Sequence, residues 1–115
     1  MQLSNSLIND FSKALDDRIK LKGLLELIDG LVIKAALKLM RKSFWDKLNE
    51  DAQRLIIALM EAFVSGDYSA LPALTAAELN AKIDIPRISE GTEGKLMGAI
   101  LEAAFEIALD HKKAA

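Results

Sequence analysis

Acidic residues spaced four apart near the end of the chain form the first group that could do chemistry. Glu102, Glu106 and Asp110 fall on one face of any helix that contains them, and His111 follows directly. Carboxylates and an imidazole can ligate a metal ion, but di-iron bundles use Glu-x-x-His pairs with matching acids on facing helices. Here Glu106 and His111 are five residues apart, and the chain has one histidine. We therefore expect a solvated or ion-paired face, with no metal and no other cofactor.

A row of basic residues in the first half of the chain is the second group. It consists of Lys34, Lys38 and Arg41, followed by Lys42 and Trp45. Basic residues beside an aromatic ring can contact nucleic acid, yet helix C-termini collect Lys and Arg because of the helix dipole. The net charge of -2 provides no general attraction to nucleic acid, so nucleic acid is not the expected partner.

The acidic and basic rows are complementary in charge. Like charges four residues apart on a helix each cost a few tenths of a kcal/mol, so each row is stabilised by facing the other. We expect Lys34 and Lys38 to pair with Glu102 and Glu106, either within one chain or across a dimer.

Residues 90–95, EGTEGK, resemble a phosphate-binding loop only superficially. Their spacing does not fit GxxxxGK[ST], Leu96 stands where Ser or Thr should ligate magnesium, and Glu93 would repel phosphate. We interpret the segment as the start of a helix. Gly94 and Gly98 make one side of that helix thin, which predicts close approach of a neighbouring helix at Gly30.

Catalytic groups are sparse in this sequence. The chain has no cysteine, so it offers no thiol nucleophile and no thiolate metal site. Polar residues in and after the segment IDIPRIS could line a cleft, but Asp84, Arg87, Ser89 and Glu90 contain no nucleophile with its base and orienting group. We expect that the protein is not an enzyme.

The stretch 24–40, LLELIDGLVIKAALKLM, is the element around which the others must be arranged. On a helix its apolar residues form one continuous face and extend round most of the remaining surface. The expected face consists of Leu25, Ile28, Val32, Ala35, Ala36 and Leu39, and the extension of Leu24, Leu27, Leu31, Ile33 and Leu37. A helix that is apolar nearly all round has to be covered by other helices or by another subunit.

Five further segments follow from capping signals, apolar periodicity and a proline. Ser4 or Ser6 begins a helix that ends near Lys22, and Asn49 begins one that ends at Ser65 and Gly66. A capping box at Thr75 and Glu78 predicts a short helix over 76–82, followed by an extended strap over 83–89 and a last helix over 92–111. Phe44 and Trp45 are expected to close one end of the bundle.

The fold expected for residues 1–115 is a single all-α domain. It is a compact four- to five-helix bundle with a central hydrophobic helix and one extended strap segment. Hydrophobic residues make up 51% of the chain but aromatic residues only 5%, which is typical of packed helices.

The function expected is a non-enzymatic interaction or structural module that self-associates as a dimer, because the apolar helical surface exceeds what a short chain can cover. The expected interface comprises Leu24, Leu27, Leu31, Lys34, Leu37, Lys38, Gly94, Gly98, Glu102 and Glu106. One alternative is a helical pocket protein that binds an apolar ligand or lipid beside Met40, Met60 and Met97. A further alternative is a small regulator that contacts nucleic acid through residues 34–45.

The expected compartment is the cytoplasm. The lack of cysteine fits a reducing environment, and residues 1–10 lack the basic start of a signal peptide. The stretch 24–40 is too short for a membrane span, and its four charged residues would be costly in lipid.

Overall fold

The computed structural model describes residues 2–22, 30–71 and 92–114, and the side-chain environments of 2–18, 30–71 and 98–111. All regular secondary structure within these ranges is helical. The elements are α1 (Asn5–Lys22), α2 (Gly30–Ser43), the short 3-10 helix η1 (Trp45–Lys47), α3 (Glu50–Ser65) and α5 (Thr92–Ala114). The all-α bundle expected from the composition is therefore confirmed. The predicted helix over 76–82, the strap over 83–89 and the first residues of the stretch 24–40 lie outside the described residues.

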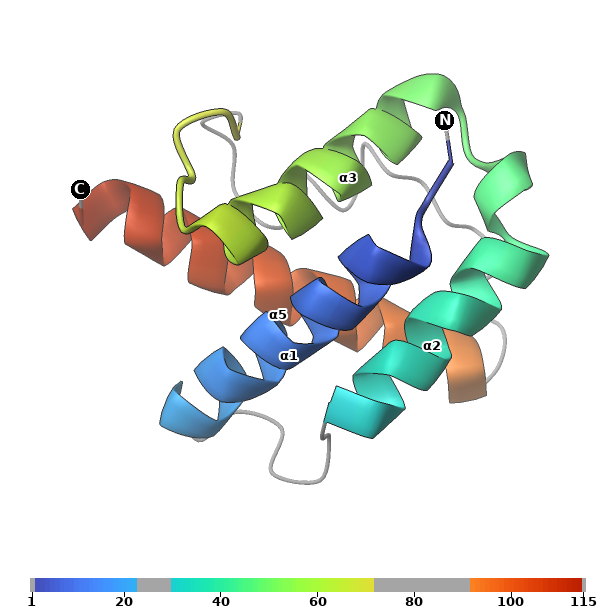
Figure 1. Ribbon diagram of the computed structural model, residues 1–115, viewed down its shortest axis with the longest axis horizontal. Coiled ribbons are helices and arrows are strands. Elements are labelled where there is room, and N and C mark those ends of the chain that lie inside the picture. Colours follow the sequence, from blue (N-terminus) through green and yellow to red (C-terminus); the bar gives the residue numbers. More distant parts are fainter. Residues whose placement is uncertain (1, 23–29, 72–91, 115) are drawn as a thin grey trace.

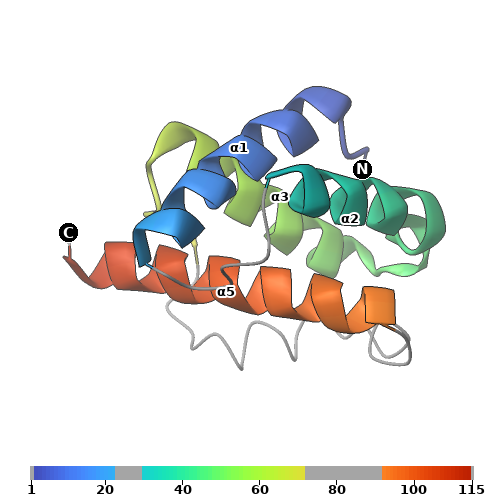
Figure 2. The same cartoon turned by 90° about the horizontal axis from the view of Figure 1, so that it is seen from below.

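The helices form two layers. In Figure 1, α1 lies between α2 and α3 and packs on both of them, while α5 crosses behind. Figure 2 shows α5 as a separate layer, and it packs on α2 and on α3. None of the described helices combines the length and the apolar character that crossing a membrane requires.

Local capping signals begin and end these helices where they were predicted. The Ser4 hydroxyl oxygen accepts a hydrogen bond from the Leu7 backbone N–H at 3.1 Å, just before α1. The Asn49 side chain accepts one from the Ala52 N–H at 2.8 Å at the start of α3. Gly66 ends α3 in the left-handed conformation, with φ of 81°, and its N–H donates to the Ala62 carbonyl.

The corner between α2 and α3 is closed by an aromatic side chain, as predicted. Trp45 is buried and Phe44 is half-buried beside it. The buried side-chain amide of Gln53 donates a 2.7 Å hydrogen bond to the Trp45 carbonyl. This bond joins η1 to α3 and satisfies the buried Gln53 amide, while the same carbonyl also accepts from the Leu48 N–H.

Four rings in consecutive contact link three helices and a turn. Phe11 of α1 packs edge-on against Phe63 of α3, with ring centroids 5.3 Å apart. Phe63 meets Tyr68 edge-on at 5.7 Å, and Tyr68 stacks on His111 of α5 at 5.2 Å. Edge-to-face and offset-stacked rings are favoured geometries, so this ring column, Phe11, Phe63, Tyr68 and His111, stabilises the contact between both layers.

The buried face of α2 differs from the predicted one. It consists of Ile33, Ala36, Leu37 and Met40, whereas Val32 and Leu39 are half-buried and Ala35 is exposed. The physical reason is that α1 and α5 cover neighbouring sides of α2 and leave its opposite side in solvent. Prediction of Leu37 as an interface residue is therefore wrong, because its side chain is fully buried in the core.

Candidate functional site

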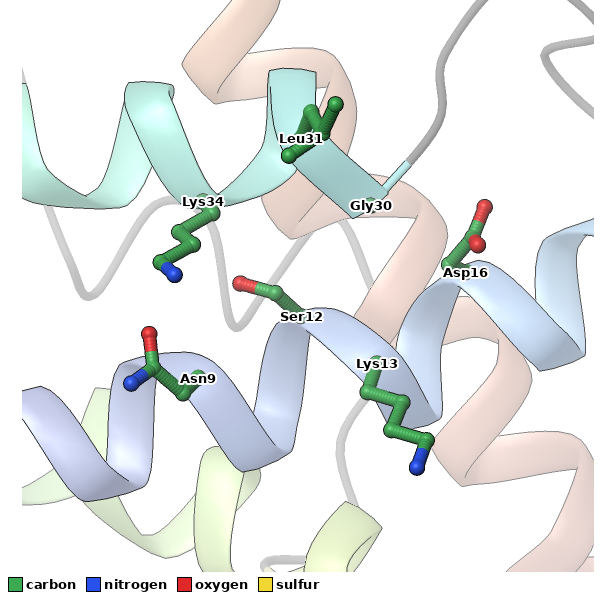
Figure 3. Close-up of a pocket in the computed structure, with 7 residues that line it drawn as sticks. All are labelled: Asn9, Ser12, Lys13, Asp16, Gly30, Leu31 and Lys34. Carbon is green, nitrogen blue, oxygen red and sulfur yellow. The ribbon is translucent and has the colours of Figure 1, made fainter.

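A solvent-open groove of about 350 Å³ runs between α1 and the start of α2 (Figure 3). Its α1 wall includes Asn9 and Ser12, and its α2 wall includes Leu31 and Lys34. Lys34 points across the groove towards Asn9 and Ser12, whereas the Lys13 side chain on α1 points away from α2 (Figure 3). The groove therefore presents the Lys34 ammonium group, the Asn9 side-chain amide and the Asp16 carboxylate beside an apolar rim.

At one end of the groove, α1 and α2 approach each other closely at Gly30. A Cβ atom at Gly30 would lie 3.4 Å from a carboxylate oxygen of Asp16. Gly30 therefore faces α1 and not the last helix, which corrects the sequence-based expectation. The buried Ser12 donates its hydroxyl proton to the Ile8 carbonyl at 2.7 Å, so that proton is committed within α1.

Leu31 stands at the rim of the groove and is 77% exposed. Together with exposed Ala35 and half-buried Leu39 it forms a row at four-residue spacing, which we call the α2 ridge (Leu31, Ala35 and Leu39). Lys38 is exposed one turn beyond Lys34, on the flank of this ridge. Of the predicted interface residues on this helix, Leu31, Lys34 and Lys38 thus lie at the surface, and Leu24 and Leu27 fall outside the described residues.

The acidic row on α5 also faces solvent. Glu102 and Glu106 are both exposed, and within the described part of the chain neither forms an ion pair with Lys34 or Lys38. The predicted pairing of the two rows is therefore absent from the single copy over these residues. No group of three potential metal ligands is found among the described residues either.

The described part of the chain does not pack tightly against Gly98, where the sequence predicted close approach of a neighbouring helix. No described atom lies within 4 Å of the position that its Cβ would occupy. The predicted close approach between Gly98 and Gly30 is therefore wrong, because the described residues of α5 that pack into the core are on another side of the helix. The surroundings of Gly94 lie outside the described side chains.

A polar cluster that the sequence analysis missed joins three separate segments. Arg18, on α1, hydrogen-bonds through Nη1 to Nε2 of His111 on α5. Since arginine only donates, the imidazole accepts this hydrogen bond at Nε2. Tyr68 stacks on the same ring, and its buried hydroxyl has no hydrogen-bond partner among the described residues.

The environment of this cluster shifts the ionisation of Tyr68. Burial raises the pKa of the Tyr68 hydroxyl above its ordinary value, and the nearby positive charge of Arg18 opposes the shift. His111 Nε2 is occupied by Arg18 and the Tyr68 hydroxyl is shielded from solvent. The cluster is therefore a structural contact that holds the second half of α5 against α1. No local sequence pattern indicates this contact, because Arg18 and His111 are 93 residues apart.

The two alternative functions, nucleic-acid contact and binding of an apolar ligand, depended on residues that are buried or bonded within the fold. Trp45 is buried and cannot stack on a base, and Arg41 donates to the Leu3 carbonyl and to the Asn5 side chain. Met40 and Met60 are fully buried among core side chains. These residues stabilise the bundle and do not form an exposed basic patch or an adaptable pocket wall.

Comparison of the chain with protein-family models, with curated proteins and with solved structures finds no match.

Proposed function

We propose that this protein is a non-enzymatic interaction module that self-associates through the α2 ridge. The observation that carries the proposal is the 77% exposure of Leu31. Scattered exposed leucines are common on protein surfaces, but Leu31 belongs to a row with Ala35 and Leu39. A row at four-residue spacing is the kind of ridge by which two helices interdigitate, and the small Ala35 allows close approach.

A second copy of the chain is the partner that we propose. Most soluble oligomers are formed by identical subunits, and a two-fold axis lets one surface be buried twice. Lys34 and Lys38 flank the ridge and add a polar rim, which is the usual composition around an apolar contact. The lack of cysteine is compatible with the cytoplasm, in which we propose that the module acts.

Substitution of Leu31 tests the proposal. Burying a leucine side chain contributes roughly 1.5–3 kcal/mol. A dimer that buries Leu31 of both subunits should therefore lose at least about 3 kcal/mol of association free energy in the Leu31→Glu variant. That loss corresponds to at least about a 100-fold rise in the dissociation constant. Sedimentation equilibrium over a dilution series should show the wild type approaching twice its 12.6 kDa mass and the variant remaining a monomer.

Val64→Glu is the matched control for this experiment. Val64 is the other exposed large apolar residue of the described chain, at 45%, and it lies in the last turn of α3. That turn is on the far side of α1 from α2 (Figure 1). The control should keep the wild-type dissociation constant. A wild-type chain with the mass of one copy at every concentration would refute the proposal.

A further inference from the structure

We infer that the acidic row of α5 in one copy docks on the basic flank of the α2 ridge in a second copy. The acidic row is Glu102 and Glu106, and the basic flank is Lys34 and Lys38. This inference rests on the proposed self-association and names the two surfaces that meet.

On the basic flank, Lys34 is the residue that lines the groove and can bind a carboxylate. Lys34 is half-buried in the groove wall, and its side chain points towards Asn9 of α1 (Figure 3). The ammonium group can donate to a carboxylate oxygen, and the Asn9 side-chain oxygen is the atom of that amide directed towards Lys34 (Figure 3). Asp16 also lines the groove, but it lies at the Gly30 end and takes part in another interaction of the chain.

The two rows match in spacing as well as in charge. Residues four apart on a helix are separated by about 6 Å along the axis, so Glu102 and Glu106 repeat with the same rise as Lys34 and Lys38. Within the described residues both rows are unpaired in the single copy. Each row therefore carries repulsion between like charges that contact with the other row relieves.

The ionic contact determines orientation, while the apolar ridge supplies most of the affinity. Exposed ion pairs contribute little free energy, but complementary charges select one arrangement and exclude those in which like charges meet. In a dimer with a two-fold axis the contact forms twice, since each copy presents its α5 to the basic flank of the other.

A pair of charge-reversed variants tests this arrangement. In Lys34→Glu with Lys38→Glu, both contacting rows are acidic. In Glu102→Lys with Glu106→Lys, both are basic. Each double variant alone should self-associate at least about tenfold more weakly than the wild type. An equimolar mixture should recover the wild-type dissociation constant, because each contact in the mixed dimer again joins opposite charges. Sedimentation equilibrium of the two variants and of the mixture measures these values.

Salt dependence and an internal control separate this effect from a change in net charge. Raising the sodium chloride concentration should weaken the wild-type dimer and strengthen association of each double variant, since screening reduces attraction and repulsion alike. Asp51→Lys with Glu61→Lys makes the same change of net charge as Glu102→Lys with Glu106→Lys, at exposed positions of α3, and should keep the wild-type dissociation constant.

The outcomes distinguish failure of this inference from failure of the proposed function. If Leu31→Glu dissociates the dimer but both double variants associate like the wild type, the ridge contact stands and the charge contact is wrong. Folded double variants, as judged by circular dichroism, that do not recover in the mixture also overturn the charge contact. A monomeric wild type overturns both.

Discussion

The ionisation of the Tyr68 hydroxyl depends on the side chains that enclose it. The side chain is 6% exposed, with Phe63 on one side and His111 on the other, and the oxygen has no hydrogen-bond partner among the described residues. A phenolate in this place would lose its hydration without gaining a donor. The fold therefore favours the neutral form of Tyr68.

This preference has a measurable consequence, because Tyr68 is the chain's single tyrosine. Absorbance near 295 nm should report ionisation with a midpoint above the ordinary value of about 10, while the urea-unfolded chain should titrate at about 10. The raised pKa stabilises the fold fully below about pH 10, and this stabilisation is lost as pH rises towards the folded-state value. Arg18→Gln removes the opposing charge and should raise the midpoint further.

Tyr68→Phe provides the control for that titration. The variant has no ionising hydroxyl, so it should keep more of its unfolding free energy than the wild type does when both are taken above pH 10. A tyrosine midpoint at or below 10 in the folded wild type would contradict the enclosed environment that we describe.

The leucines of α2 mark what the sequence could and could not predict for single residues. Leu31 was expected at the surface and is there, whereas Leu37 was expected beside it and is buried. A helix that is apolar on most sides has no clear periodicity from which to choose the buried side. The choice depends on where α1 and α5 cross α2, and local patterns do not contain that information. The same reason explains why the contact between Arg18 and His111 was missed.

At the scale of helices, the ends are better predicted than the faces. Asn49 and Gly66 bound α3 as expected because their effects act within one turn of backbone. The structural role expected for Gly98 failed because it required knowledge of the neighbouring helix. Capping is a local interaction, and helix crossing is not.

Two glycine-to-alanine substitutions should have opposite effects on stability. Gly66→Ala forces a residue with a Cβ into the left-handed conformation at φ of 81° and should destabilise the protein by about 1–2 kcal/mol. Gly98→Ala adds a methyl group where no described atom lies within 4 Å, inside a helix that alanine favours. It should stabilise the protein by about 0.5–1 kcal/mol.

Urea denaturation of both variants beside the wild type measures these free energies. If Gly98→Ala instead destabilises the protein, that result would support the tight packing at Gly98 that was predicted from the sequence.

At the scale of the molecule, composition was sufficient for the class of fold but not for its arrangement. Abundant leucine, isoleucine and alanine with few aromatic residues predicted packed helices, and the described chain is a bundle with a radius of gyration of 12.9 Å. This value is close to the roughly 13 Å expected for a globule of this length. The layering, with α1 between α2 and α3 and with α5 behind, depends on contacts between residues far apart in the chain (Figures 1 and 2).

The ring column also makes the chain a convenient subject for unfolding measurements. Trp45 precedes α3 and Tyr68 follows it, so the two intrinsic chromophores flank a helix about 24 Å long. Tyr68 reports on α1, α3 and α5 through its neighbouring rings, whereas Trp45 reports on the junction with α2. If both layers melt as one cooperative unit, second-derivative absorbance should give the same midpoint for both chromophores. Separate midpoints would divide the molecule into two foldons that meet along α3.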